Sequence, residues 1–416
     1  MVDNLYKSSF VKTKTCSCIL GIIIYFVSFN SQAQKVIPFS GIGYTAEKSV
    51  ARNSMPYSFQ FIGDLELGSK SDFVQALDQA AGDIELSNGS ILSVNKENKL
   101  ETLNESLVVA LALESERMKT ISLSPSEYQM TFDLDAQILT FNFKTKSIVA
   151  AYPMRLTLVN VLDQEPTDQD LEALAKVMFE GDPKQNLFDD LPRSYLIDNF
   201  MARVQNISIK PDWLWKIRIK DIEFSEMASQ VLANHGLNQD QIRQLAASSL
   251  SSSLSTTLNI PILPYVKSDA IRDSMTIKFS DTDLMDLRIP RANFHINLVF
   301  RGFGSRELKS TERVSVKSFV SGIRVSVEDN DRGKVFLDAK LQSGNLKKLS
   351  KEAEVDLWSE YETSFISLLD QIVSQFDKPD DKWMKEHASD KKRSKQLVKD
   401  FQRVNDRVIR LFRAKR

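Results

Sequence analysis

Cysteine is almost absent from this chain, and the two that occur lie at its start. Of 416 residues, Cys16 and Cys18 are the only cysteines, and both precede the first apolar run. A lipid-attachment cysteine would follow such a run, so neither suits that role. The chain beyond this segment has no thiol for a disulfide, a nucleophile or a cysteine metal site. A chain of this length can build its core without disulfides.

Histidine and recognisable catalytic motifs are also scarce. The histidines are His235, His295 and His387, none with a second histidine or a paired carboxylate at metal-ligand spacing. We expect His295, on the polar side of a strand, to lie at the surface or to be hydrogen-bonded. The H-E-x-x-H, G-x-S-x-G, P-loop and G-x-G-x-x-G patterns do not occur. We therefore expect no catalytic residues and no cofactor; a hydrolase whose triad is recognisable only in space is an alternative.

The net charge of −1 indicates no nucleic-acid partner. One acidic group offers a weak candidate for a divalent cation: Asp281, Asp283 and Asp286 lie between two short predicted strands. Aspartates also hydrogen-bond their own backbone in turns, which is the interpretation we favour. We therefore predict no metal site. The run 328–333 is interpreted in the same way, as a hairpin turn.

The first residues have the order of a secretory signal peptide. Lys7, Lys12 and Lys14 precede an apolar run from Ile19 to Phe29, and small residues follow. This order predicts residues 1–33 as a signal with cleavage after Ala33. An uncleaved anchor or a buried helix is the alternative, although the run is shorter than the ~20 residues that span a bilayer. We expect a periplasmic or outer-envelope location.

Alternating apolar and polar residues predict a β-rich domain over residues 34–165. The clearest strands are 128–134 and 147–162, whereas residues 36–66 carry turn-type residues such as Gly41 and Gly43. A helix capped by Thr167 and a turn-rich linker then fill 166–194.

A second domain is predicted over residues 195–376. Strand patterns occur at 213–224, 294–301, 314–327 and 335–341, and helix patterns at 239–258 and 358–376. The serines of 248–255 also admit a flexible linker, which the four-residue spacing of leucines disfavours. The fold class is therefore predicted as α/β, with α+β as the alternative, and with helices packed on a sheet in each of two domains.

Residues 238–376 resemble the periplasmic CsgG/TolB-N-terminal-like α/β family. The similar segments are the helix 248–258, the strands 293–298 and 323–327, the turn-and-return Asp329-Asn330-Asp331-Arg332-Gly333-Lys334-Val335, and the closing helix 358–376. The resemblance implies a part of an envelope, secretion or flagellar assembly that is not an enzyme and is often oligomeric. It implies no catalytic residues. The chain lacks a lipid-attachment cysteine and an obvious pore-forming strand pair, so we do not expect a curli-type channel.

Residues 377–416 form a linker and then a basic amphipathic helix. Its apolar residues recur at spacings of four and three, and its polar face is rich in lysine and arginine. The predicted interaction residues are Leu397, Phe401, Val404, Val408, Leu411, Lys399, Arg403, Arg407 and Arg410. The helix could dock on its own chain, form a coiled coil with a partner or a second copy, or contact anionic lipid headgroups.

Together these features predict a non-enzymatic exported envelope protein that acts through protein–protein contacts or self-association. It would be an assembly or accessory subunit. The alternatives are a small-molecule or lipid-binding protein, with an apolar pocket around Phe132, Phe141 and Met154, and a hydrolase with an unrecognised site.

Overall fold

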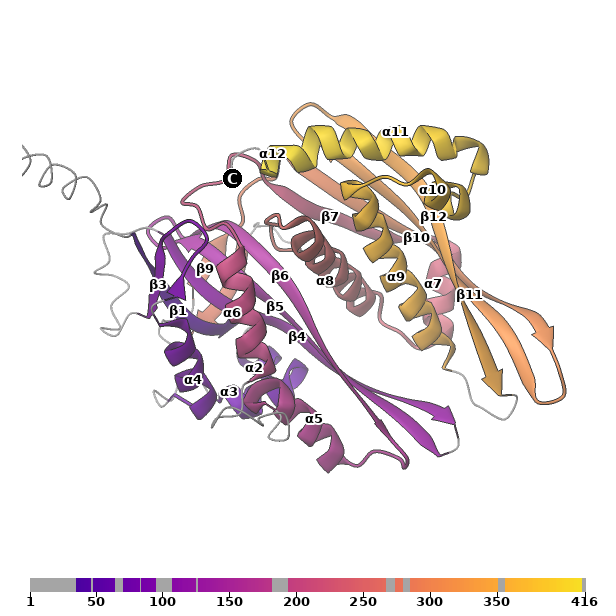
Figure 1. Cartoon of the computed structure of the whole chain (residues 1–416), viewed down its shortest axis with the longest axis horizontal. Helices are drawn as coiled ribbons and strands as arrows, with labels where there is room; N and C mark the ends of the chain where they lie inside the picture. The colour runs from indigo at the N-terminus through magenta and orange to yellow at the C-terminus, as the bar shows by residue number, and fades with distance from the viewer. Residues whose placement is uncertain are drawn as a thin grey trace, which may run out of the picture.

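The computed structural model describes residues 35–45, 48–63, 70–82, 84–94, 107–124, 126–181, 194–266, 274–279, 285–350 and 356–413. The predicted signal segment with its cleavage point and the linker at 182–193 lie outside these residues. The fold is mixed α/β, as predicted, with two sheets and packed helices (Figure 1). No helix in the described ranges is long and apolar enough to cross a membrane.

The first sheet contains eight strands in the order β2-β3-β1-β4-β5-β6-β9-β8. Their bounds are β1 Val36–Tyr44, β2 Ile84–Glu85, β3 Ile91–Val94, β4 Leu107–Ser124, β5 Glu127–Asn142, β6 Ser147–Leu162, β8 Ser274–Phe279 and β9 Met285–Arg288. Because β8, the last strand in this order, also pairs with β1, the strands from β1 to β8 in the order close into a ring. It encloses an apolar cluster that includes Phe141, Ile277 and Leu287.

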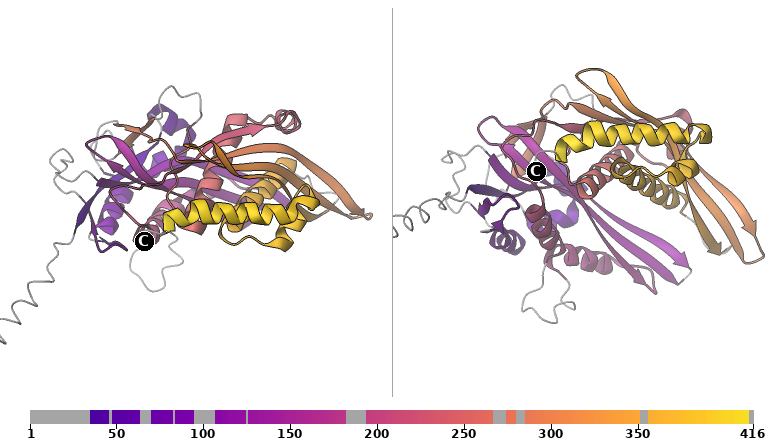
Figure 2. Two further views of the ribbon diagram at one scale, coloured as in Figure 1. Left: turned by 90° about the horizontal axis from the view of Figure 1, so that it is seen from above. Right: turned by 45° about the horizontal axis from the view of Figure 1, so that its top comes forward.

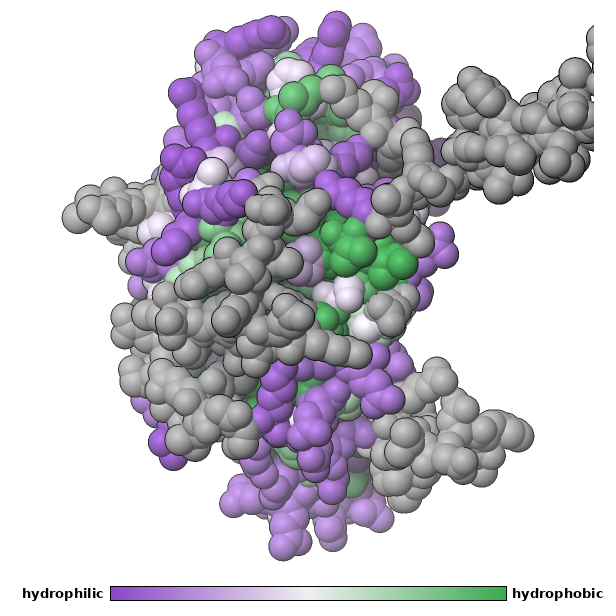
Figure 3. Space-filling view, turned by 90° about the vertical axis from the view of Figure 1, so that its left-hand side faces the viewer, coloured by the Kyte–Doolittle hydropathy of each residue, from purple (hydrophilic) through white to green (hydrophobic). Residues whose placement is uncertain are grey.

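The predicted turns at the start of the first domain are instead a buried strand. Strand β1 runs through Gly41, where a positive φ of 82° accompanies a shift of its pairing with β4 between Phe39 and Ile42. Glycine adopts this conformation without a steric penalty, so here it marks a bulge within a strand. Apolar side chains are visible at this end of the molecule, beside residues drawn in grey (Figure 3).

The second sheet has four strands in the order β12-β11-β10-β7. They are β7 Ile217–Phe224, β10 Phe294–Ser310, β11 Val314–Asp329 and β12 Lys334–Ser350. Strand β7 is parallel to β10, and β10, β11 and β12 form an antiparallel meander. Strand patterns were predicted at 294–301, 314–327 and 335–341, and the hairpin turn predicted at 328–333 joins β11 to β12.

Five helices cover one face of the first sheet: α2 Lys48–Ser54, α3 Pro56–Ile62, α4 Asp72–Ala81, α5 Asp168–Glu180 and α6 Tyr195–Asn206. Phe200 of α6 packs on Phe39 of β1, with ring centroids 5.4 Å apart. The cap predicted for α5 is present, since the Thr167 hydroxyl accepts from the Asp170 amide. Packing therefore places α6 with the first sheet, although residue 195 was the predicted start of the second domain.

Two long helices lie between the sheets: α8 Gln239–Leu258 and α9 Leu357–Asp377 (Figures 1 and 2). The serine-rich segment is thus helical, and Ser248 and Ser255 are buried. Small side chains allow a helix to be packed on both sides. Ion pairs join α9 to the first sheet, with Glu362 2.9 Å from Arg117 and 3.6 Å from Lys119 of β4. The layers run helices, sheet, helices, sheet.

Candidate functional site: a basic groove beside the C-terminal helices

The C-terminal segment is broken into several short helices. After α9 come α10 Asp381–His387, η2 Lys391–Arg393, α11 Ser394–Val404, the π turn η3 Asn405–Ile409 and α12 Arg410–Arg413. The remaining helix, α7 (Glu226–Asn234), lies earlier in the chain, before α8. The predicted amphipathic helix corresponds to α11 through α12. π turns are rare, and those that occur within helices often lie at functional sites.

The apolar seam of this segment is buried within the chain. Leu397, Phe401, Val404 and Val408 are each at most 3 % exposed, and Phe401 packs on Phe376 of α9 at 5.4 Å. The Asn405 side chain donates to the carbonyl oxygens of Phe376 and Asp377, both at 2.7 Å. These four apolar residues therefore do not offer the surface for a partner that was predicted, because α9 and β12 already cover them.

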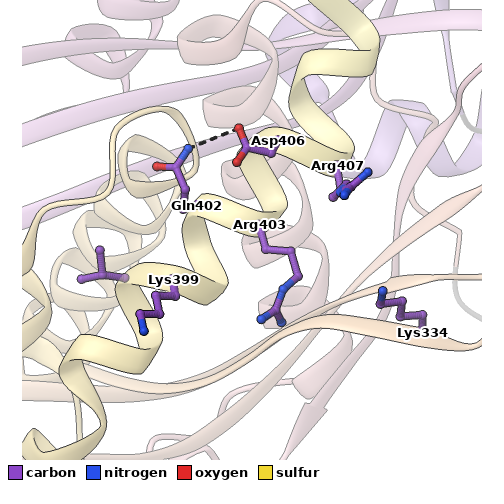
Figure 4. Close-up of a pocket in the computed structure, with 7 residues that line it drawn as sticks. Lys334, Lys399, Gln402, Arg403, Asp406 and Arg407 are labelled. Carbon is purple, nitrogen blue, oxygen red and sulfur yellow. Dashed lines mark hydrogen bonds between the residues drawn. The ribbon is translucent and has the colours of Figure 1, made fainter.

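The polar side of the same segment lines a groove against the start of β12. One part, of about 470 Å³, is lined by Lys334, Val398, Lys399, Gln402, Arg403, Asp406 and Arg407. Lys399 and Arg403 extend from the helix toward the strand, and Gln402 and Asp406 lie on the other side (Figure 4). We call this, with the part described next, the basic groove.

The second part of the basic groove has an aromatic wall. It measures about 510 Å³, shares Lys334, Asp406 and Arg407 with the first part, and reaches Leu411. Trp215, Phe294 and Phe336 form the wall, with centroid distances of 5.8 Å for the first pair and 6.3 Å for the second. A ligand here would meet flat apolar surface beside positive charge.

The acidic residues around the groove are already occupied. Asp406 pairs with Arg410 at 3.0 Å and accepts from Gln402 at 3.3 Å. Asp329 accepts from the backbone amides of Asp331 and Arg332. Asp331 lies 3.4 Å from Arg291. Arg332, which also lines the groove, lies 4.0 Å from Asp329, but none of these carboxylates pairs with Lys334, Lys399 or Arg407.

Most of the cations around the groove have no acidic partner. Arg403 is held, by the Phe336 carbonyl oxygen at 3.3 Å and by Asp400 at 3.2 Å. Lys399 and Arg407 have no hydrogen bond or ion pair to any residue that the structure describes, and Lys334 makes only a ring contact, 5.8 Å from Phe336. Exposed lysine and arginine beside one another bind carboxylate or phosphate oxygens through charge-assisted hydrogen bonds.

The other predicted site residues do not come together to form a site in the described part of the chain. Asp286 of β9 accepts from the Thr276 hydroxyl at 2.5 Å, whereas Asp281 and Asp283 lie outside the described residues. Within those residues, no three histidine, cysteine, aspartate or glutamate side chains are placed to hold a metal ion. Arg410 is committed to Asp406, and Leu411 borders the groove.

His295 is buried, contrary to the expected surface or hydrogen-bonded position. Its exposed fraction is 7 %, and its Nδ1 atom has no hydrogen-bond partner and lies 3.8 Å from Glu328. Burial, and then the nearby Lys220 and Arg218, lower the pKa of its imidazole. The ring is therefore held neutral within a sheet, and among the described residues no serine is hydrogen-bonded to it.

An apolar ligand pocket around Phe132, Phe141 and Met154 is not formed as predicted. Phe132 belongs to the main core and Phe141 to the separate cluster in the closed end of the first sheet. The two lie nine residues apart on β5, so they face opposite sides of the sheet. They cannot line one cavity.

Comparisons with known proteins identify no family for this chain. No family model and no curated protein matches it. Among solved structures, an "Ntf2 like protein involved in plasmid conjugation" aligns with 60 % of this chain and 81 % of its own at 8 % identity, with a TM-score of 0.10. That similarity is too low to support a conclusion about fold or function.

Proposed function

We propose that this is a non-enzymatic exported envelope protein that acts by holding a partner protein, and that the basic groove binds an acidic segment of that partner. The observation that carries the proposal is that Lys334, Lys399 and Arg407 face one groove and form no ion pair with any described residue, while the carboxylates beside them, Asp329, Asp331 and Asp406, are paired elsewhere. Cations left unpaired in this way favour a negatively charged ligand.

An acidic peptide suits the groove better than a bare ion does. The aromatic wall of Trp215, Phe294 and Phe336 would take an apolar side chain, while the cations take carboxylates on either side of it. Apolar anchors surrounded by charged contacts are the usual anatomy of a protein-binding surface. The same cations could also contact anionic lipid headgroups, and the experiment below separates the two.

The binding test uses the chain from Gln34 onward and two probes. The first is a labelled peptide of alternating glutamate and phenylalanine, followed by fluorescence anisotropy; the second is a vesicle containing phosphatidylglycerol. We expect the peptide to bind with an affinity that falls as salt rises. Lys399→Glu combined with Arg407→Glu should weaken it at least about tenfold, equivalent to ~1.4 kcal/mol.

The control is Lys391→Glu with Lys392→Glu, which changes the net charge equally but lies in η2, outside the groove lining. It should leave peptide affinity unchanged. Equal loss in both double variants would mean non-specific charge attraction. Vesicle binding without peptide binding would replace the protein partner with a lipid surface. Either result overturns the proposal.

The export part of the proposal has a separate test. Cells expressing the full chain should yield, from the envelope fraction, a protein whose first residue is Gln34, because the residues before it have the order of a signal peptide. N-terminal sequencing measures this directly. An intact Met1 on cytosolic protein would contradict export without affecting the groove.

A further inference from the structure

Both meanders extend as three-stranded arms beyond the helices that cover them (Figures 1 and 2). We call the ends of β4, β5 and β6 (residues 117–124, 127–131 and 157–162), together with residues 163–165 that follow β6, the first arm. The ends of β10, β11 and β12 (304–310, 314–320 and 343–349) are the second arm. We propose that the second arm of one copy of this protein docks on the first arm of another.

One face of the first arm presents exposed valines, and acidic residues follow them in the chain. Cross-strand pairing puts Val159 in a row with Thr131 and Lys119, and Val161 in a row with Gln129 and Ile121. Val159 and Val161 are 55 % and 51 % exposed. Nearer the middle of β6, the same face carries Arg155, which donates to Ser248 of α8. Because this face of the sheet lies toward α8, we call it the inner face.

The acidic residues lie directly after these valines. Asp163 and Glu165 follow β6 at the end of the first arm, and both are exposed. Neither forms an ion pair with a residue that the structure describes. The two cations of this face, Arg117 and Lys119, are already paired with Glu362. The inner face of the first arm therefore presents exposed valines beside an acidic end.

The second arm has the opposite character on the face that turns away from α9. Leu346, 68 % exposed, lies in a row with Ser318 and Arg306, and the next row contains Val316 between Lys309 and Lys348. The other face of this arm carries Phe319, which packs on Tyr361 of α9. Arg306, Lys309 and Lys348 have no acidic partner among the described residues. This outer face is an apolar strip with a positive border.

The two complementary faces cannot meet within one chain. The inner face of the first sheet looks toward α8 and α9, and the outer face of the second sheet looks away from them, so the two surfaces point in the same direction. Contact between them requires a second copy, and each copy still has one free face of each kind. Such a head-to-tail contact builds a ring or an open filament.

Each arm also has a strand edge that is free to pair with another chain. The outer edges of β12 and of the end of β6 have no neighbouring strand in the described sheets, apart from a single bridge between Leu341 and Ala388. An exposed edge with apolar side chains is a template for pairing with another chain. Opposite charges at the two faces favour arm-to-arm docking over docking of like arms.

The charge test uses two double variants of the chain from Gln34 onward, measured by sedimentation velocity at low salt. The unaltered protein should form species larger than one chain. Arg306→Glu with Lys348→Glu should make it monomeric, and so should Asp163→Lys with Glu165→Lys. An equimolar mixture of the two variants should regain the large species, because each then offers faces that complement the other.

Cysteine crosslinking gives an independent measurement, because the chain after residue 33 contains no cysteine. The paired substitutions Val161→Cys and Leu346→Cys should give a ladder of disulfide-linked chains under mild oxidation. The matched control Val161→Cys with Val335→Cys uses another exposed β12 residue, outside the second arm, and should not.

Monomeric unaltered protein at its highest soluble concentration would overturn the proposal. Large species that survive both charge reversals, or equal ladders from both cysteine pairs, would also overturn it. The variants of the basic groove should self-associate normally, so this result is independent of the binding test above.

Discussion

In each half of the chain, one strand runs parallel to the first of three long antiparallel strands, and helices and two short strands form the connection. Strand β1 stands beside β4, β5 and β6, and β7 beside β10, β11 and β12. The difference is in what covers the two meanders. The first has helices on both faces, and the second has α9 on one face while its other face carries exposed polar residues such as Arg324. Similar strand patterns therefore acquire different environments.

The difference is clearest for two cross-strand ion pairs. In the first sheet, Asp135 binds Arg155 through both carboxylate oxygens, at 2.7 and 2.9 Å, and also accepts from Ser248 of α8. In the second sheet, Asp338 binds Arg324 at 2.7 and 2.8 Å with both side chains about half exposed. The geometry is the same, but water reaches only the second pair.

The largest expected effect comes from removing one partner of the buried pair. Asp135→Ala leaves the Arg155 guanidinium unpaired between the first sheet and α8. We expect the free energy of unfolding to fall by about 3–5 kcal/mol, measured by urea denaturation. The double variant Asp135→Leu with Arg155→Met should recover much of that loss, because it removes the buried charge. A loss below ~1 kcal/mol in the single variant would mean that water enters this layer.

The next effect tests how tightly α8 is enclosed. Ala246 is fully buried on this helix, so Ala246→Leu should overpack the layer and cost about 1–3 kcal/mol. The matched control is Ala173→Leu on α5, where the alanine is exposed on the outer layer; it should change stability by less than about 0.5 kcal/mol. Equal effects in the two helices would contradict the enclosed position of α8.

A titration effect follows from the same enclosed layer. Burial first, and the nearby Asp135 second, raise the pKa of Glu114 on β4 to about 8, from an ordinary value of 4.5. Between these values the folded chain keeps a proton that the unfolded chain loses. Stability should therefore decrease as pH rises from 5 to 8, by at most ~1.4 kcal/mol per pH unit, and less because the side chain is only partly buried. Glu114→Gln should flatten this part of the profile in urea unfolding measured across pH, and an unchanged slope would contradict the assignment.

Local patterns predicted most of the elements but not their partners. The four-residue spacing of leucines predicted α8, and the alternation at 294–301 predicted β10. The position of Ser248 against Asp135, 113 residues away, depends on long-range packing that no local pattern encodes. For the same reason, the hairpin β8–β9 was not expected to complete the first sheet.

The candidate site was partly predictable in the same sense. The spacing of apolar residues in 397–411 predicted an amphipathic helix, and its lysines and arginines predicted a charged face. The apolar seam is covered by α9 and β12. A periodic pattern within the segment cannot reveal which distant elements pack on it. Lys334 and Trp215 were missed because each lies in a different strand region, far from the tail in sequence. The turn at 328–333 was predicted. The lysine that directly follows its glycine was therefore the available signal for Lys334 as a residue of the groove.

The smallest expected effect comes from the exposed pair of the second sheet. Asp338→Ala should reduce the free energy of unfolding by less than about 1 kcal/mol, because Arg324 regains water when it loses its partner. A double-mutant cycle with Arg324→Ala isolates the pair, and the coupling should shrink further in 1 M salt, where charges are screened within about 3 Å. A coupling as large as that of Asp135 with Arg155, and insensitive to salt, would show that this face is covered in solution. The two halves would then share an environment as well as a topology.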